Sequence, residues 1–194
     1  MTLWRPIIFI CGQLLLVMAL LMGLVAAFSV LRGDPETGVF FRSALITLGI
    51  GLAMLAWGRT RHFHLVARQL YLLTTAAWLL MSLAGALPLF FSHFQLSFTD
   101  AVFEAVSGIT TTGSTVLSGI ETLAPSLLLW RSLLQWLGGL GVIGMAVSIL
   151  PYLRIGGMRL FHTESSDWSE KSMPRIQTLA RLLLVTYLAI TLAC

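Results

Sequence analysis

The sequence predicts an all-α protein that crosses a membrane several times. Of its 194 residues, 57% are hydrophobic and 10% carry a charge, and the mean hydropathy is +0.90. Soluble domains carry about 25% charged residues, so this chain cannot cover a water-facing surface. Apolar runs near the length of a membrane-spanning helix, about 20 residues, recur along it. We therefore expect a helical hairpin, then a span, a re-entrant pore loop and a second span, and finally the start of a further unit.

Five apolar segments are long enough, or nearly so, to cross a bilayer. They are roughly Pro6–Leu31, Val39–Trp57, Gln69–Phe91, Ser126–Leu153 and Thr178–Cys194. The expected domains are an N-terminal transmembrane hairpin with its cytoplasmic loop, a first repeat, a cytoplasmic linker, and the truncated first helix of a second repeat. Their boundaries are residues 1–68, 69–155, 156–177 and 178–194.

The first apolar run predicts a spanning helix and not a signal peptide. Ile7–Leu31 is about 25 residues long, whereas the apolar core of a signal peptide has about 7–15 residues. Pro6 suits the first turn of a helix, where its missing N–H costs nothing. Gly33–Glu36 (GDPE) is a turn signal, so the first two spans should form an antiparallel hairpin.

Between the third and fourth spans lies an apolar segment that is too short to cross. Phe98–Ile109 (FTDAVFEAVSGI) would reach about 18 Å as a helix, roughly half of a bilayer. Ser97, with Asp100 three residues later, is a weak capping-box pattern that would start this helix. Such re-entrant backbone is tolerated at membrane depth only where it is buried in protein or lines water.

The polar segment that follows, Thr110–Thr115 (TTTGST), has the chemistry of an ion-selective strand. A cation in a bilayer must exchange its water for other oxygens, and main-chain carbonyls with threonine hydroxyls supply them without fixed charge. Threonine favours an extended backbone, and Gly113 permits a positive φ, so successive carbonyls can turn toward one axis. The half-helix directs the negative end of its dipole at the pore. The alternative is a plain polar loop, the default in a soluble protein.

The basic residues predict the orientation. They gather before the first span, between the second and third, and between the fourth and fifth: Arg5, Arg59, Arg61, Arg68, Arg154, Arg159, Lys171 and Arg175. The positive-inside rule places these regions, and with them the N-terminus, in the cytoplasm. The loop His93–Leu123 then lies outside.

The segment SFTDAVFEAVSGITTTGSTV resembles the first pore loop of the Trk/Ktr/HKT superfamily, specifically the TrkH-type potassium transporters. The resemblance continues through WRSLLQWLGGLGVIGMAVSILP in the next span and through the predicted cytoplasmic stretch GGMRLFHTESSDWSEKSMPRI. The leading hairpin also fits the TrkH branch. Nearly the whole chain is covered, while the chain itself corresponds to the N-terminal part, less than half, of a typical member.

The resemblance implies a potassium site made mainly of backbone carbonyls. The residues that match the family's filter strand are Thr111, Thr112, Gly113 and Ser114. Gly113 matches the glycine associated with potassium preference, and a serine there is associated with sodium permeation in plant relatives. Potassium is thus the expected transported substrate, and no organic cofactor is expected.

The implied function is potassium uptake, passive or as a proton symport, by a pore-forming multi-pass subunit of the bacterial cytoplasmic (inner) membrane. The implied partners are membrane lipid, a second copy in a homodimer, and a cytosolic nucleotide-binding regulatory subunit of the TrkA type, with no nucleic acid. The sequence carries no enzyme motif such as H-E-x-x-H. The alternatives are a sodium-conducting relative and a non-conducting membrane scaffold.

Two features of the fourth span have competing interpretations. Arg131 could pair with Glu104 or Asp100 and brace the half-helix, or it could extend to the outer interface. Gly139–Gly144 (GLGVIG) has the spacing of a dinucleotide fingerprint, but inside an apolar span close helix packing is favoured. A gating hinge at these glycines is the functional alternative.

One filter strand cannot surround an ion, since a pore needs about four such loops. The chain either forms a tetramer or belongs to a longer chain with internal repeats. The fifth span stops at Cys194 after about 17 residues, slightly short for a crossing. This indicates truncation, and we expect the fragment alone to conduct nothing.

Overall fold

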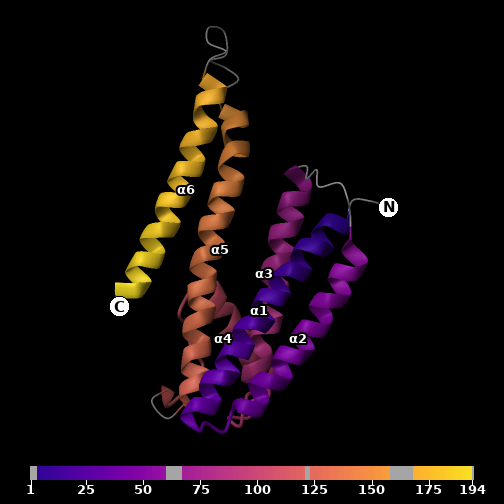
Figure 1. Cartoon of the computed structure of the whole chain (residues 1–194), viewed down its shortest axis with the longest axis vertical. Helices are drawn as coiled ribbons and strands as arrows, with labels where there is room; N and C mark the ends of the chain where they lie inside the picture. Colours follow the sequence, from indigo (N-terminus) through magenta and orange to yellow (C-terminus); the bar gives the residue numbers. More distant parts are fainter. Residues whose placement is uncertain (1–3, 60–66, 121–122, 158–167, 194) are drawn as a thin grey trace. The chain divides into compact units, whose positions relative to one another are not determined.

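The computed structural model describes residues 4–59, 67–120, 123–157 and 168–193, and these form helices and no strands. Figure 1 shows the elements in chain order. The helices are α1 (Arg5–Arg32), α2 (Thr37–Gly58), α3 (Ala67–Phe90), α4 (Phe98–Ile109), α5 (Pro125–Gly157) and α6 (Trp168–Ala193). The all-α prediction is confirmed.

Four helices are long and apolar enough to cross a membrane, namely α1, α2, α3 from Arg68, and α5 as far as Met145. These correspond to the first four predicted spans and make the chain a multi-pass membrane protein. Helix α6 differs from the expectation, because it begins at Trp168, ten residues before Thr178. Main-chain hydrogen bonds continue a helix through polar residues that hydropathy excludes from a span, and the apolar part of α6 is the shorter stretch Arg181–Ala193.

The chain divides into two compact units, Met1–Gly138 and Gly139–Cys194. In the second unit Tyr187 of α6 packs so closely on Gly139 of α5 that a Cβ atom at Gly139 would overlap its ring. Close packing is thus confirmed at Gly139, whereas a Cβ at Gly144 would meet open space. Of the expected cytoplasmic linker, residues 156–177, the part 158–167 lies outside the described residues, and 168–177 belong to α6.

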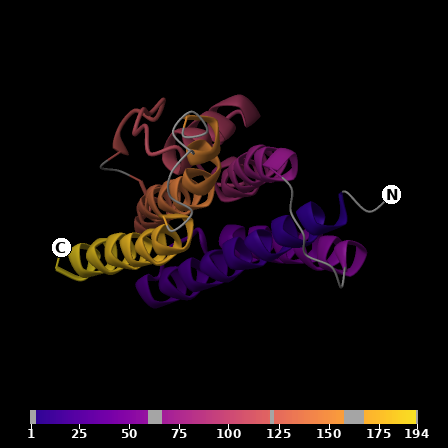
Figure 2. The same cartoon turned by 90° about the horizontal axis from the view of Figure 1, so that it is seen from above.

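In the first unit, α1 and α2 form the predicted antiparallel hairpin and lie side by side (Figures 1 and 2). Glycines allow the two backbones to approach. A Cβ atom at Gly12 would lie 3.0 Å from the carbonyl oxygen of Gly51, and one at Gly58 would lie 2.6 Å from the nitrogen of Phe9. Small residues serve this purpose in membrane helices, because lipid provides no hydrophobic drive for helices to associate.

The turn of this hairpin is tied to the start of α5. Helix α1 ends at Gly33, which has the left-handed φ of 65° typical of a helix C-terminus. The next residue, Asp34, is 8% exposed. One of its carboxylate oxygens accepts a hydrogen bond from Glu36 N–H (2.9 Å) and the other from Ser126 N–H (3.0 Å), 92 residues along the chain.

The same turn also contacts the end of α3. The Glu36 side chain is buried, and its Oε1 accepts a hydrogen bond from His93 N–H at 3.2 Å. The His93 ring nitrogen Nδ1 lies 3.0 Å from the same oxygen. The turn of the hairpin, the end of α3 and the start of α5 are therefore joined by two buried carboxylates.

Trp130 of α5 lies at the centre of the core and is fully buried. Its ring meets Phe40 of α2 edge-to-face, with centroids 6.0 Å apart. Its indole N–H donates to the carbonyl oxygen of Gly85 in α3 at 2.9 Å. Pro88 lies three residues after Gly85 in α3 and lacks the N–H that a helix would otherwise direct at the Ala84 carbonyl. The core thus holds α5 against α2 and α3.

Candidate functional site

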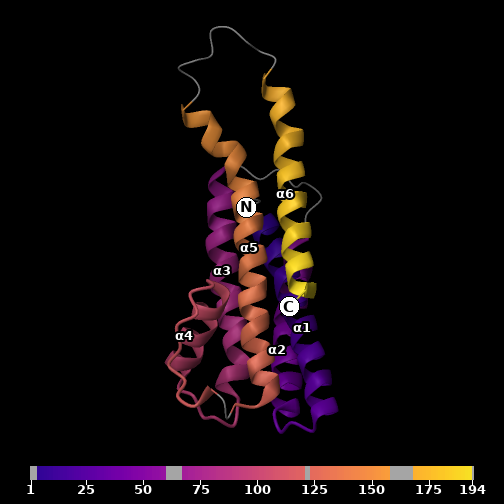
Figure 3. The same ribbon diagram turned by 90° about the vertical axis from the view of Figure 1, so that its left-hand side faces the viewer.

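Helix α4 begins where the sequence predicts and has the predicted length. Ser97 precedes it in extended conformation, and its hydroxyl oxygen accepts a hydrogen bond from Asp100 N–H at 3.1 Å. The hydroxyl also donates to the Asp100 carboxylate at 2.7 Å. The capping interaction is confirmed. The helix has 12 residues, about 18 Å at 1.5 Å per residue, and it packs beside α3 as a much shorter element (Figure 3).

The end of α4 is a Schellman motif with threonine in place of the usual glycine. Thr111 N–H donates to the carbonyl of Gly108 (2.9 Å) and Thr112 N–H to that of Ser107 (3.0 Å), and Thr111 has a φ of 58°. A β-branched residue at positive φ is an outlier. The expectation of an extended backbone is therefore wrong at Thr111, because the hydrogen bonds that end the helix require a left-handed residue there.

After this reversal the chain runs back along α4. The Ser107 hydroxyl donates to the carbonyl oxygen of Ser114 at 2.6 Å. Oε1 of Glu104 accepts hydrogen bonds from the Thr115 hydroxyl and from Val116 N–H, both at 2.6 Å. Residues 107 and 104 of the helix thus pair with residues 114 and 115–116 of the returning segment. We call residues 110–116 the return strand. The name refers to the course of the chain, and these residues form no β-strand.

The four residues expected to bind potassium are consecutive and exposed on the return strand: Thr111, Thr112, Gly113 and Ser114. Gly113 has the positive φ that was expected, 77°. A Cβ atom there would meet only Gln135 Nε2, at an ordinary contact distance of 3.7 Å. Backbone conformation, and not lack of space, therefore favours glycine at this position. The Ser114 carbonyl oxygen already accepts the Ser107 hydroxyl, while the Thr112 hydroxyl bonds that of Thr110 at 2.8 Å.

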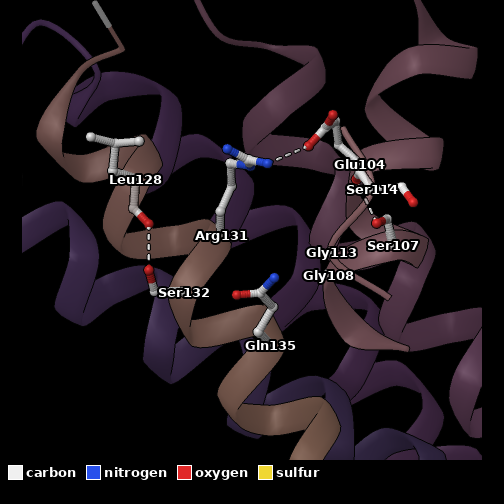
Figure 4. A pocket seen from close by; sticks show the side chains of 9 residues that line it. All are labelled: Glu104, Ser107, Gly108, Gly113, Ser114, Leu128, Arg131, Ser132 and Gln135. Carbon is white, nitrogen blue, oxygen red and sulfur yellow. Dashed lines mark hydrogen bonds and ion pairs between the residues drawn. The ribbon is translucent and has the colours of Figure 1, made fainter. Parts of the chain in front are cut away.

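The ion pair between Arg131 and Glu104 is confirmed. Arg131 Nη2 lies 3.0 Å from Glu104 Oε2, and the glutamate side chain is 1% exposed against 21% for the arginine (Figure 4). Asp100, the other candidate partner, instead bonds Ser97. The Glu104 carboxylate is therefore contacted through both oxygens, by the return strand on one and by α5 on the other.

A cavity of about 210 Å³ opens between α4, the return strand and α5. Its lining is largely polar and consists of Glu104, Ser107, Gly108, Gly113, Ser114, Leu128, Arg131, Ser132 and Gln135. Arg131 and Gln135, one turn apart on α5, line the same side of it (Figure 4). In the described part of the chain, no three His, Cys, Asp or Glu side chains come together as metal ligands.

Helix α5 meets the C-terminal end of α4 through glycine. A Cβ atom at Gly138 would overlap the main-chain carbonyl of Ile109, the last residue of α4. A Cβ at Gly108 would lie 3.1 Å from Cβ of Leu134, which is itself buried. The position at which the return strand leaves α4 is thus set by direct backbone contact with α5.

Ser107 was missed by sequence reasoning. Its hydroxyl fixes the Ser114 carbonyl, and its own carbonyl accepts the N–H groups of Thr112 and Gly113 (3.0 and 3.3 Å). The available signal was a small polar residue in the last turn of the helix, among mostly apolar neighbours. Serine hydroxyls commonly bond nearby backbone, so such a residue next to a reversal is a candidate anchor.

The chain matches one protein family and several potassium uptake proteins. The family model TrkH, described as cation transport protein, matches residues 37–194. The chain is 45% identical to the Trk system potassium uptake protein TrkI of Halomonas elongata, covering 97% of this chain and 38% of the relative. It is 36% identical to the Trk system potassium uptake protein TrkH of Escherichia coli K12, covering 98% and 40%.

Among solved structures, the crystal structure of the potassium transporter TrkH from Vibrio parahaemolyticus matches with a TM-score of 0.81 and 35% identity. The match covers 98% of this chain and 38% of that one. The chain therefore spans about two fifths of the length of these relatives.

Proposed function

Because this chain belongs to the TrkH family of cation transport proteins, we propose that it supplies the first quarter of the potassium pore in a Trk-type uptake system. The family's members are ion transporters and not enzymes, as the sequence led us to expect. The relatives that it matches are named as potassium uptake proteins. Potassium is then the transported substrate, and the site must be built to replace its water.

The observation that carries this proposal is the geometry of α4 and the return strand. A helix of 12 residues is too short to cross the hydrocarbon core, which takes about 20, and the chain returns along it through hydrogen bonds to Ser107 and Glu104. A segment of this form can enter a membrane and leave by the same side, as a re-entrant pore loop. Main-chain oxygens are then presented at its tip, at the negative end of the α4 dipole.

We assign the potassium ligands to the main-chain carbonyls of Thr111, Thr112, Gly113 and Ser114. Two positive φ angles, 58° at Thr111 and 77° at Gly113, alternate with Thr112 between them. In an extended strand successive carbonyls point to opposite sides, and such alternation turns them toward a common side. This supports a row of neutral oxygens able to stand in for hydration water.

The proposed orientation has the N-terminus in the cytoplasm and the hairpin turn outside. Contacts of Asp34 with Ser126 and of Glu36 with His93 gather the hairpin turn and both ends of the loop between α3 and α5 at one end of the first unit. These two loops are the ones that the positive-inside rule assigns to the outer face. Residues 1–68 would then form the hairpin and its loop, 69–155 the first repeat, 156–177 the linker, and 178–194 the start of the second repeat.

We place the protein in the bacterial cytoplasmic membrane. Lipid contact follows from the exposed apolar side chains of its spans. Its family resemblance implies a homodimer of the full-length protein and a cytosolic nucleotide-binding subunit of the TrkA type. We propose both for the whole protein, and we propose that its potassium uptake is either passive or coupled to protons.

The Gly113→Ser variant of the full-length transporter tests the filter assignment. A serine at a φ of 77° is strained, by about 1–2 kcal/mol in the left-handed region, so the strand should relax and its carbonyls should move. We expect the ratio of rubidium to sodium uptake to fall by about tenfold, the equivalent of 1.4 kcal/mol. Uptake into cells that lack other potassium systems measures it.

Three results of this experiment would point elsewhere. A wild-type protein that takes up sodium as well as rubidium would identify a sodium-conducting relative. A wild-type protein that takes up neither, although it is inserted in the membrane, would favour the non-conducting scaffold. An unchanged ratio in Gly113→Ser would remove Gly113 from the filter.

A further inference from the structure

We propose that Glu104 is a positioning residue for ion selection, which holds the outer end of the return strand in register with α4. This inference rests on the proposed function, because it assumes that the return strand is the filter. It assigns to Glu104 a role separate from ion binding. Its carboxylate contacts Thr115 and Val116, just beyond the last proposed ligand.

The Glu104 carboxylate connects three segments. It projects from α4, its Oε1 accepts the Thr115 hydroxyl and Val116 N–H at 2.6 Å each, and its Oε2 lies 3.0 Å from Arg131 of α5. Hydrogen bonds to a carboxylate are shorter and roughly twice as strong as neutral ones. Among the described residues, Glu104 is the carboxylate that contacts both the return strand and α5.

The proposed ligand residues, Thr111–Ser114, are held by hydrogen bonds at both ends. Their inner end is fixed by the Schellman motif, in which Thr111 and Thr112 donate to α4 carbonyls. Their outer end is fixed twice, by Ser107 at the Ser114 carbonyl and by Glu104 at residues 115 and 116. Ser107 and Glu104 are three residues apart and so share one face of α4. The spacing of the carbonyls between these anchors depends on both.

Burial of the Glu104 carboxylate has an energetic cost. A carboxylate that is 1% exposed is costly to keep in a protein unless it is paired and hydrogen-bonded. A buried ion pair can often be replaced by apolar residues without loss of stability. Stability alone therefore does not account for Glu104. Fixing a unique register is the best-attested use of such a pair, and here the segment whose register is fixed is the proposed filter.

The test compares four variants of the full-length transporter by the ratio of rubidium to sodium uptake in reconstituted vesicles. They are Glu104→Gln, Arg131→Gln, the double variant, and Asp100→Asn as the matched control. Asp100 is a carboxylate on the same helix, one turn earlier, that contacts only Ser97 in the described structure. We expect the ratio to fall about tenfold in Glu104→Gln and to stay at the wild-type value in Asp100→Asn.

Arg131→Gln should lower the ratio at least as far, because it leaves a buried charge unpaired. The double variant should lose less than the product of the two single losses, since residues in direct contact are not additive. Thr115→Val provides a second route if Glu104→Gln does not reach the membrane. It removes one hydrogen bond to Glu104 with little change of volume, and it should lower the ratio in the same direction.

A merely structural brace would give a different result. Protein yield, or rubidium and sodium uptake together, would then fall in Glu104→Gln and Thr115→Val while their ratio stayed constant, and that outcome overturns the inference. If Gly113→Ser changes the ratio in the same assay, the proposed function stands although Glu104 does not position the strand. If neither variant changes it, the filter assignment itself is wrong.

Discussion

Among the described residues of the first unit, the carboxylates of Asp34, Glu36 and Glu104 are buried, and each joins segments that are distant in sequence. Asp34 holds the start of α5, Glu36 the end of α3, and Glu104 the return strand. An unpaired charge at these depths would be very costly. The partners were not predictable from the sequence, because nothing local relates Asp34 to Ser126 or Glu36 to His93.

Asp34 should give the protein a measurable acid sensitivity. Burial raises the pKa of Asp34, but hydrogen bonds from Glu36 and Ser126 outweigh burial and hold the pKa below its usual value. A carboxyl with a lowered folded-state pKa stabilises the fold above its unfolded value of about 3.9, and this stabilisation is lost as pH falls toward the folded value. We expect the thermal unfolding temperature in detergent to fall below about pH 4.

The Asp34→Asn variant is the control for that titration. At neutral pH it should be less stable by about 1–3 kcal/mol, the value of hydrogen bonds to a charged group. It should also lose the part of the acid-dependent fall that is due to Asp34. An acid-dependent fall as steep in Asp34→Asn as in the wild type would show that other groups are responsible.

The backbone conformation of Thr111 differs from what its residue type predicts. Its neighbour Gly113 was expected to have a positive φ because glycine permits it, and it does. Threonine rarely adopts that conformation, so the φ of 58° at Thr111 could not be foreseen. Strained residues of this kind cluster at functional sites, which agrees with its place in the proposed filter.

At the scale of elements, α4 was the most predictable helix and α6 the least. The bounds of α4 follow from the Ser97 cap and from an apolar run that ends at the threonines. The four spans follow from hydropathy. The start of α6 at Trp168 does not follow from hydropathy. Hydropathy identifies the part of a helix that can lie in lipid, and it does not detect a polar extension of that helix.

Gly138 of α5 should tolerate substitution poorly. A Cβ atom there overlaps the Ile109 carbonyl, so Gly138→Ala must displace the end of α4, and overpacking of this kind costs about 1–3 kcal/mol. We expect a lower unfolding temperature and reduced rubidium uptake. Thermal unfolding in detergent and uptake in cells measure the two effects.

Gly144→Ala is the matched control on the same helix. A Cβ at Gly144 meets nothing within 4 Å, and alanine is the better helix former by about 1 kcal/mol. This variant should keep the wild-type stability or exceed it slightly. If Gly144→Ala instead impairs uptake while Gly138→Ala does not, a hinge in α5 becomes the better explanation for its glycines than close packing.

At the scale of the whole molecule, the first unit joins a helical hairpin to the segment that we propose as one repeat of a pore. The hairpin packs through glycines and the buried Trp130 core, and its turn is tied to the end of α3 and the start of α5. The return strand lies exposed in this single chain, as expected for one of about four loops that surround an ion. The relatives, of which this chain spans about two fifths, are long enough to hold the others.

The most direct test of a pore lined by the return strand is thiol block at Thr112. The background is a full-length transporter in which every cysteine, Cys11 and Cys194 included, is replaced by serine. Thr112→Cys is compared with Ser118→Cys, an exposed residue beyond the return strand. Silver ions added from outside should stop rubidium uptake in Thr112→Cys, excess potassium should slow the block, and Ser118→Cys should remain active. Equal indifference of both cysteines to silver would contradict a potassium path along Thr111–Ser114.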